Sequence, residues 1–196
     1  MSLTPEDDFA GPVVLDASAI INLLGCGAAE RVLRSLGYAC IVEERVLAEI
    51  VYHPVPGADH AHEVEALLAA GLLSMHRMSD SEYNVYLGLT SVGGVGGLGV
   101  GESAAIAVAS QRQLAVVLDD RKARRLCSTR MPGLAVVSTL KLFVAAAYRA
   151  GWPFEELTKV TRTAQLTSCM CVLKDERDLV ARLNLTSTGV TAQLPR

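Results

Sequence analysis

Short apolar runs recur along the chain and alternate with longer segments whose apolar residues are spaced as on one face of a helix. The runs are too brief for helices and rich in β-branched residues, which is typical of buried strands. Strands that alternate with helices predict an α/β fold, a three-layer α/β/α sandwich with a central parallel sheet. We expect its strands at residues 13–15, 39–42, 72–78, 114–120 and 134–139.

The longer segments predict helices between these strands and after the last of them. Gly37 and Gly71 are expected to end two of these helices. The last two helices lie in the C-terminal segment after residue 151. The expected helices begin near residue 19 and shortly after residue 42, and otherwise cover residues 28–37, 61–71, 80–90, 102–113, 121–129, 140–151, 155–164 and 175–183.

The length and composition set the domain organisation. A chain of 196 residues with 51% hydrophobic content can bury one substantial core. We therefore expect one domain over residues 1–150, with residues 151–196 as a helical extension packed on the same domain. The polar end of this extension is expected to fray.

Several classes of protein are disfavoured by composition. No apolar run approaches the ~20 residues that span a bilayer, and the acidic start "MSLTPEDDFA" is unlike a signal peptide, so we expect a cytoplasmic protein with no membrane partner. Five cysteines without C-x-x-C spacing argue against a disulfide framework and a zinc ribbon. The net charge of -3 gives no global signal for nucleic acid, so contact with a polyanion depends on a local basic cluster.

A glycine-rich stretch, "GGVGGLGVGE" at residues 93–102, contains the pattern G-x-G-x-x-G from Gly94 to Gly99. A dinucleotide-binding loop requires a strand before the glycines, whereas the preceding "SEYNVYLGLTS" is predicted to be helical. No G-K-[ST] follows, so a P-loop is also disfavoured. We interpret the run as a flexible connector to the next helix.

Acidic residues follow two of the predicted strands, Asp16 after "VVL" and Asp119 with Asp120 after "AVVL". The carboxyl ends of parallel strands share one edge of the sheet, and the helix that begins near Glu102 starts at the same edge. Clustered carboxylates repel one another unless a cation neutralises them, and oxygen ligands favour Mg²⁺ or Mn²⁺. Taken singly, each acid is equally well explained as a helix cap or as part of a solvated face, as for Glu49.

Four pieces of the chain resemble the PIN-domain nucleases, which include VapC-type toxin ribonucleases. They are "VVLDASAIINLL", "VLAEI", "LGVGESAAIAVA" and "VVLDDRKARRL", and they extend over about residues 12–150. The second piece is short, and Glu43 and Glu44 remain rivals of its Glu49. On this resemblance the glycine run delivers Glu102 to the sheet edge and holds no nucleotide.

The resemblance implies a metal-dependent endoribonuclease that hydrolyses phosphodiester bonds in single-stranded or structured RNA. Leu118 departs from a threonine common in the family. Successive strand residues face opposite ways, so one of the two adjacent aspartates would serve, and the family's T-x-D spacing favours Asp120. The implied catalytic and Mg²⁺- or Mn²⁺-binding residues are Asp16, Glu49, Glu102 and Asp120 or Asp119, and Ser18 would assist by orienting Asp16 or holding a water molecule.

The densest basic cluster comprises Arg121, Lys122, Arg124 and Arg125, with Arg130 further on. At helical spacing Arg121, Arg124 and Arg125 share one side, and we expect these three residues and Lys122 to bind substrate phosphates without reading bases. An ordinary solvated face is the alternative. Nine aromatic residues among 196 provide no evident platform for base stacking.

The resemblance also implies partners, namely an RNA substrate, a second copy in a homodimer and, if the chain is a toxin, an antitoxin. Two alternatives stay open. One is a non-catalytic PIN-like binding or scaffold protein. The other is a phosphate-transferring protein with Asp16 as nucleophile, although Ser18 stands where a dehalogenase-like site has its second acid, and the acidic pair comes too late for a receiver domain.

Overall fold

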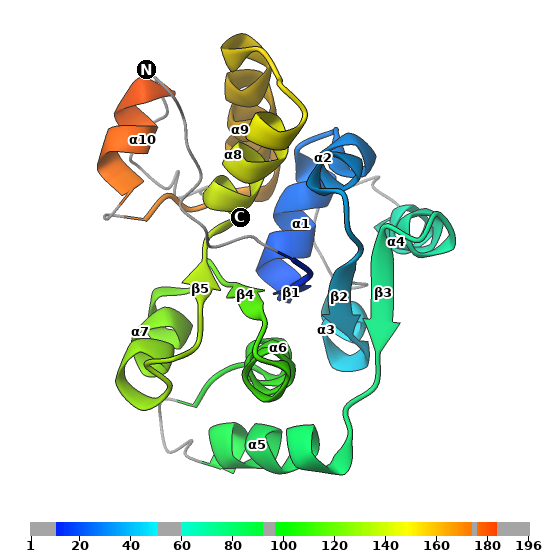
Figure 1. Ribbon diagram of the computed structural model, residues 1–196, viewed down its shortest axis with the longest axis vertical. Coiled ribbons are helices and arrows are strands. Elements are labelled where there is room, and N and C mark those ends of the chain that lie inside the picture. Colours follow the sequence, from blue (N-terminus) through cyan, green and yellow to red (C-terminus); the bar gives the residue numbers. More distant parts are fainter. Residues whose placement is uncertain (1–10, 51–59, 92–96, 174–175, 184–196) are drawn as a thin grey trace, which may run out of the picture.

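The fold is built on one five-stranded sheet in which every pair of neighbouring strands is parallel (Figure 1). The computed structural model describes residues 11–50, 60–91, 97–173 and 176–183. The strand order is β3-β2-β1-β4-β5. The strands are β1 (Val13–Leu15), β2 (Cys40–Glu43), β3 (Leu73–His76), β4 (Ala115–Val117) and β5 (Val136–Val137).

Ten helices lie in the described ranges, and they occupy the segments in which helical periodicity predicts them. They are α1 (Ala17–Gly25), α2 (Ala29–Leu36), α3 (Glu44–Ile50), α4 (His60–Ala69), α5 (Asp80–Ser91), α6 (Val100–Arg112), α7 (Arg121–Arg130), α8 (Thr139–Arg149), α9 (Phe154–Ser168) and α10 (Arg177–Arg182).

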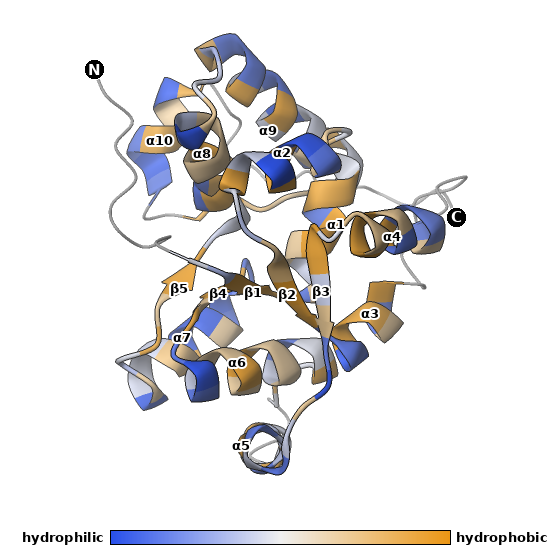
Figure 2. Cartoon of the chain, turned by 45° about the vertical axis from the view of Figure 1, so that its right-hand side comes forward, coloured by the Kyte–Doolittle hydropathy of each residue, from blue (hydrophilic) through white to orange (hydrophobic). Residues whose placement is uncertain are grey.

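The helices cover both faces of the sheet, so the predicted three-layer α/β/α class is confirmed. One face carries α1, α2, α8 and α9, the other carries α6 and α7, and α5 lies outside α6 (Figures 1 and 2). Strand β1 is central, and Val13, Val14 and Leu15 are all fully buried. Hydrophobic residues accordingly concentrate along the strands and on the helix faces turned toward them (Figure 2).

Helix α6 is buried on almost every side, which is more than the single apolar face expected from its sequence. All residues from Ser103 to Ala109 are buried, because the sheet lies on one side of this helix and α5 packs against the other. Five of these seven residues are Ala or Ser, and small side chains allow both neighbours to approach closely. The first turn of α6, which contains Glu102, is therefore held firmly against the sheet.

The strand order reverses direction between β1 and β4, since β2 follows on one side of β1 and β5 on the other side of β4. In open α/β sheets such a switch point leaves a crevice at the carboxyl ends of the two strands. Asp16 directly follows β1, and Asp119 lies two residues after β4. The topology thus brings both strand-end acids to one crevice.

The segment after α8 packs on the rest of the fold through α9, which lies against α1. Gly25 permits this contact, because a Cβ there would lie 2.8 Å from Ser168 Cβ and 2.9 Å from Thr167 Oγ1. The polar end expected to fray lies outside the described residues. Of the five free cysteines, Cys169 and Cys171 are exposed and the other three are buried. No described helix has the length and apolar character needed to cross a bilayer.

Candidate functional site

Asp16 is a buried carboxylate at the junction of β1 and α1. It is 1% exposed and caps α1, with Oδ1 accepting the Ala19 N–H at 2.7 Å. The Ser18 hydroxyl lies 2.9 and 2.8 Å from its two oxygens and donates to the carboxylate. Burial, followed by the negative charge of Asp119, raises the pKa of Asp16 to about 8, and Glu102 adds to the effect. Without a compensating positive charge, the ionised form of Asp16 is therefore destabilised.

Asp119 is also buried, and protein donors bind both of its oxygens. Thr139 donates its backbone N–H to Oδ1 at 2.9 Å and its hydroxyl to Oδ2 at 2.6 Å. Asn22 donates its side-chain amide to Oδ2 at 2.8 Å. Burial raises the pKa of Asp119, while the hydrogen bonds from Thr139 and Asn22 and the charge of Arg124 oppose this shift. Asp119 thereby joins β4 to α1 and α8.

Asp120 faces the other way, as expected for consecutive residues of an extended segment. Its side chain is exposed and caps α7, with Oδ1 accepting the Ala123 N–H at 2.8 Å. Its negative charge raises the pKa of Glu102. Asp119 therefore neighbours Asp16, whereas Asp120 neighbours Glu102, and the choice between the two aspartates as metal ligand stays a prediction.

Glu102 and Glu49 meet at the first turn of α6. Glu102 Oε2 accepts the Gly99 N–H at 3.0 Å, and Glu49 Oε1 accepts the Gly101 N–H at 2.7 Å. Burial raises the pKa of Glu102, and so do the charges of Asp120 and Glu49. A Cβ at residue 101 would lie 2.9 Å from Glu49 Cδ, closer than van der Waals contact, so glycine is what allows this approach.

The rivals of Glu49 are engaged elsewhere. Glu43 is fully buried, and its two oxygens accept the backbone N–H of Arg45 at 2.6 Å and its guanidinium at 2.9 Å. Glu44 forms an exposed ion pair with Arg77. Of the three glutamates, Glu49 is the one whose side chain accepts a hydrogen bond from α6 in the described part of the chain.

All five acids share one arrangement: each accepts a backbone N–H at a helix N-terminus. The capping interpretation of the sequence is thus realised. Within the described ranges, no group of three or more His, Cys, Asp or Glu side chains is arranged as a complete metal site. The donor chemistry nevertheless suits a hard cation, because these acids offer only oxygen ligands and the charges of neighbouring acids raise the pKa of Asp16 and Glu102. The acids with this arrangement are Asp16, Glu49, Glu102, Asp119 and Asp120.

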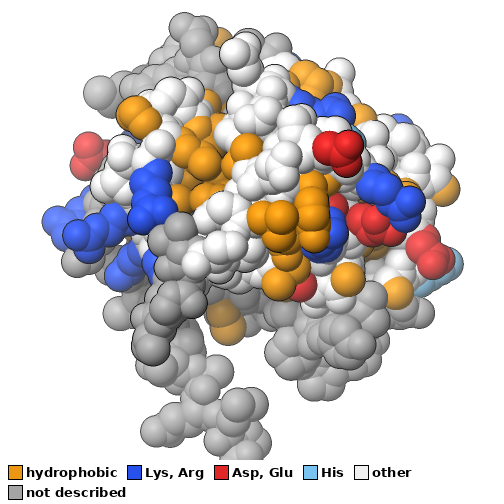
Figure 3. Space-filling model, turned by 90° about the horizontal axis from the view of Figure 1, so that it is seen from below, with side chains coloured by type: hydrophobic (Ala, Val, Ile, Leu, Met, Phe, Trp, Pro, Cys, Tyr) orange, Lys and Arg blue, Asp and Glu red, His pale blue; other side chains and the backbone are white. Residues whose placement is uncertain are grey.

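The basic cluster lies on α7, which starts directly beside these acids. Lys122 donates to the Gly97 carbonyl and tethers the end of the glycine run to α7. Arg124 donates to the Leu118 carbonyl at 3.1 Å, while Arg121 and Arg125 are exposed. Two of the four residues, Lys122 and Arg124, therefore contact the site's own backbone, and Arg121, Lys122 and Arg125 are exposed on the surface. Lys and Arg side chains gather on the α7 side of the view in Figure 3.

Two residues of this region were not identified from the sequence, namely Asn22 and Thr139. Asn22 is a polar residue within the apolar run "AIINLL" and is buried. A polar side chain in such a run requires a buried hydrogen-bond partner, so the sequence did indicate that Asn22 has one. Its partner Asp119 is 97 positions away, and no local pattern indicates that pairing.

The interpretation of the glycine run agrees with the described part of that segment. The residues before it form helix α5, so no strand precedes the glycines as a dinucleotide-binding loop requires. Residues 92–96 lie outside the described ranges. From Gly97 onward, the backbone leads directly into α6 and the contacts of Glu102 and Glu49.

Comparison with known proteins adds one match. A family model described as a PIN domain matches residues 12–161, which include every acid discussed above, the basic helix α7 and the first half of α9. No curated protein is significantly similar to the chain in sequence.

Proposed function

The chain belongs to the PIN-domain family, whose members are generally nucleases, and on that premise we propose that it is a Mg²⁺- or Mn²⁺-dependent endoribonuclease. The observation that carries this proposal is a chain of electrostatic interactions near the switch point of the sheet, in which Asp16 interacts with Asp119 and Glu102, and Glu102 interacts with Asp120. Burial raises the pKa of Asp16, Glu102 and Asp119, and repulsion by neighbouring acids adds to the shift of Asp16 and Glu102. A divalent cation is the partner that best relieves this repulsion.

Asp16, Glu102 and Asp120 are the proposed cation ligands. Each accepts one backbone N–H at one oxygen, and among the described residues no backbone N–H donates to its second oxygen. Asp119, whose two oxygens are both bound by Asn22 and Thr139, is proposed to position β4 and to add negative charge beside Asp16. When bound, the cation supplies Lewis-acid stabilisation of the charge that develops on the phosphate oxygens during hydrolysis.

The remaining groups have supporting roles in this proposal. Ser18 orients Asp16 through its two contacts with the carboxylate, and Glu49 braces the first turn of α6. Arg121 and Arg125 bind phosphates of the RNA on either side of the cleaved bond, while Lys122 and Arg124 hold the backbone of the site. A toxin role with an antitoxin partner, a homodimer and a cytoplasmic location remain predictions from the sequence.

The test is cleavage of a labelled, mixed-sequence single-stranded RNA with Mg²⁺, with Mn²⁺ and with chelator. We expect metal-dependent cleavage by the wild type and a loss of about 100-fold or more in Asp16→Asn and Glu102→Gln. Asp80→Asn and Glu155→Gln are matched controls, because both acids are exposed and lie outside the site. Undiminished cleavage by Asp16→Asn would refute the proposed site.

A second candidate is a non-catalytic PIN-like binding protein. It is favoured by two observations: the acids cap helices, and the described residues include no cluster of three metal-binding groups. Calorimetric titration with Mn²⁺ separates the two candidates. A nuclease site binds Mn²⁺ in the wild type and loses it in Asp16→Asn, whereas a non-catalytic chain shows no binding in either protein.

A further inference from the structure

A surface of defined chemistry lies beside the carboxylates, formed by Tyr83 and Tyr86 on α5 and Arg45 on α3. The two tyrosine rings stack, with centroids 5.7 Å apart and planes inclined by 24°. The guanidinium carbon of Arg45 lies 5.5 Å from the Tyr83 centroid and 5.1 Å from the Tyr86 centroid. Tyr83 is 40% exposed and the Arg45 side chain 36%. These three residues form a platform open to solvent, here termed the tyrosine-arginine platform.

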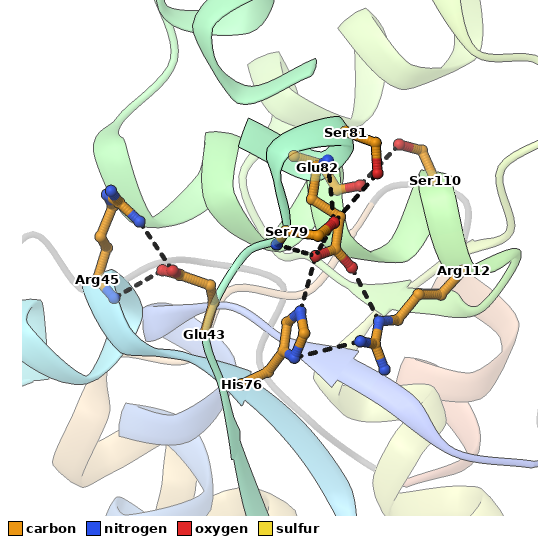
Figure 4. Close-up of polar contacts among 9 residues, drawn as sticks. Glu43, Arg45, His76, Ser79, Ser81, Glu82, Ser110 and Arg112 are labelled. Carbon is orange, nitrogen blue, oxygen red and sulfur yellow. Dashed lines mark hydrogen bonds and ion pairs between the residues drawn. The ribbon is translucent and has the colours of Figure 1, made fainter. Parts of the chain in front are cut away.

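Glu43 holds Arg45 in place. Its buried carboxylate accepts both the backbone N–H and the guanidinium of Arg45, and the side chains point toward each other in Figure 4. The guanidinium is therefore preorganised, and the carboxylate offsets its charge. A paired guanidinium attracts phosphate weakly but still presents a flat face on which a planar group can stack.

The platform adjoins the candidate active site. Arg45 and Glu49 are four residues apart on α3, so they lie on the same side of the helix about 6 Å apart along its axis. Glu49 in turn contacts Gly101 at the first turn of α6. On the face seen in Figure 3, which looks toward α5, hydrophobic side chains gather with Lys or Arg beside them, and a separate group of Lys and Arg lies toward α7.

We propose that the tyrosine-arginine platform stacks unpaired bases of single-stranded RNA next to the bond that is cleaved. This inference rests on the proposed nuclease function and deepens it by naming single-stranded RNA as the substrate class. Every base has a face that can stack on an aromatic ring, so the platform selects strandedness and tolerates any sequence. Bases inside a duplex are already paired and stacked, and they cannot reach it.

The proposal is tested by binding, in the cleavage-deficient Asp16→Asn background with chelator present. A fluorescent mixed-sequence single strand and a duplex of the same sequence are titrated and followed by anisotropy. Tyr83→Ala is expected to weaken binding of the single strand by about 5- to 150-fold. Tyr83→Phe keeps the ring and is expected to bind as the parent protein does. Tyr148→Ala is the matched control, since Tyr148 is 51% exposed on α8.

Salt separates stacking from phosphate contact. Stacking releases no counterions, so the fold-loss in Tyr83→Ala is expected to be the same at low and high salt. The duplex is expected to bind Tyr83→Ala and its parent equally. Circular dichroism checks that the variants are folded, which is expected because Tyr83 lies at the surface.

Three results would overturn the inference: unchanged binding of the single strand to Tyr83→Ala, an equal loss on single strand and duplex, or a loss that Tyr83→Phe shares. Sedimentation tests whether a second copy of the chain, in place of RNA, binds the tyrosine-arginine platform. If Tyr83→Ala converts a dimer to a monomer while RNA binding is unchanged, the surface is an interface between two copies of the chain. Wild-type cleavage with unchanged Tyr83→Ala binding refutes this inference alone, whereas absence of both cleavage and Mn²⁺ binding refutes the proposed function.

Discussion

Glu49 Oε1 accepts a hydrogen bond from the Gly101 backbone N–H at 2.7 Å, which joins the end of α3 to the first turn of α6 across 52 positions of sequence. The contact requires that residue 101 have no side chain, because a Cβ there would overlap the Glu49 carboxylate. This pair therefore explains one glycine of the glycine-rich stretch by its position in the site. It also leads to the first prediction.

Gly101→Ala is expected to displace Glu49 and to reduce cleavage about 10- to 100-fold, the usual effect of disturbing a group that orients metal ligands. Glu49 is exposed, so its side chain can move aside, and the midpoint of thermal unfolding is expected to change by only a few degrees. Gly88→Ala is the control, since a Cβ there meets nothing within 4 Å. Wild-type cleavage by Gly101→Ala would show that the Glu49 contact is dispensable.

Substitution of Asp120 is expected to weaken metal binding, whereas substitution of Asp119 is expected to destabilise the fold. Asp120→Asn retains a good helix cap and is expected to unfold near the wild-type temperature, but to bind Mn²⁺ at least about 10-fold more weakly. Asp119→Ala leaves Asn22 and the Thr139 N–H without their acceptor, at a cost of about 2–4 kcal/mol. Calorimetry with Mn²⁺ and thermal unfolding measure the two effects. The reverse pattern would assign the metal to Asp119.

Asp16 is expected to make the metal-free protein less stable as pH rises. The pKa of Asp16 is about 8 in the folded chain, which therefore retains the proton up to about that pH, while the unfolded chain releases it near the ordinary aspartate value of 3.8. Because the folded state binds more protons in this window, the free energy of unfolding falls with rising pH. Asp16→Asn removes this penalty, so in chelator its stability relative to the wild type should increase between about pH 4 and 8.

Added Mn²⁺ completes this test. The wild type is expected to gain thermal stability with Mn²⁺ at pH 8, because the cation compensates ionised Asp16 and binds the folded state alone. Asp16→Asn should gain little. A stability difference between the two proteins that is the same at every pH would contradict the assigned pKa.

The ionised Glu82 side chain is expected to stabilise the protein as pH rises, which is opposite to the effect of Asp16. Burial alone would raise its pKa, but hydrogen bonds from the Ser79 N–H, Arg112, His76 and the Ser79 hydroxyl outweigh it and lower the pKa to about 2 (Figure 4). The stability it contributes is fully present above its unfolded value of 4.5 and is lost as pH falls toward 2. Glu82→Gln should therefore cost about 1–3 kcal/mol at pH 7, and the difference from wild type should vanish near pH 2.

Urea unfolding at pH 7, 4 and 2.5 measures the contribution of Glu82. Glu65→Gln is the control, because Glu65 is exposed on α4. A destabilisation of Glu82→Gln that persists undiminished at the lowest pH would mean that its charge is not the stabilising feature.

The α7 arginines are expected to act through phosphate alone. Arg121→Ala and Arg125→Ala should each weaken RNA binding similarly for all sequences, and each should reduce the slope of log affinity against log salt by about 0.7 for a single strand. Anisotropy titrations at several salt concentrations measure this slope. Arg182→Ala, on exposed α10, is the control. An unchanged slope in both α7 variants would support the solvated-face interpretation of this cluster.

Local patterns were sufficient to predict much of the architecture. Each short apolar run became a parallel strand, since it is too short for a helix and pairing with neighbouring strands satisfies its backbone. The placement of Asp16, Asp119 and Asp120 at one sheet edge also follows from chain direction, because parallel strands end on the same side. Helix α6 was predicted in place but with a single apolar face, since the packing of α5 against it is not encoded locally.

The sequence by itself determined the order and type of elements and the edge at which the acids gather, because these depend on spacing along the chain. Tertiary structure alone decided the partners: Asn22 and Thr139 for Asp119, Gly101 for Glu49, and Arg45 for the two tyrosines. These partners are distant in sequence, and their meeting depends on strand order and on how each helix is rotated against the sheet. Nine aromatic residues indicated no stacking surface until packing brought two of them beneath one arginine.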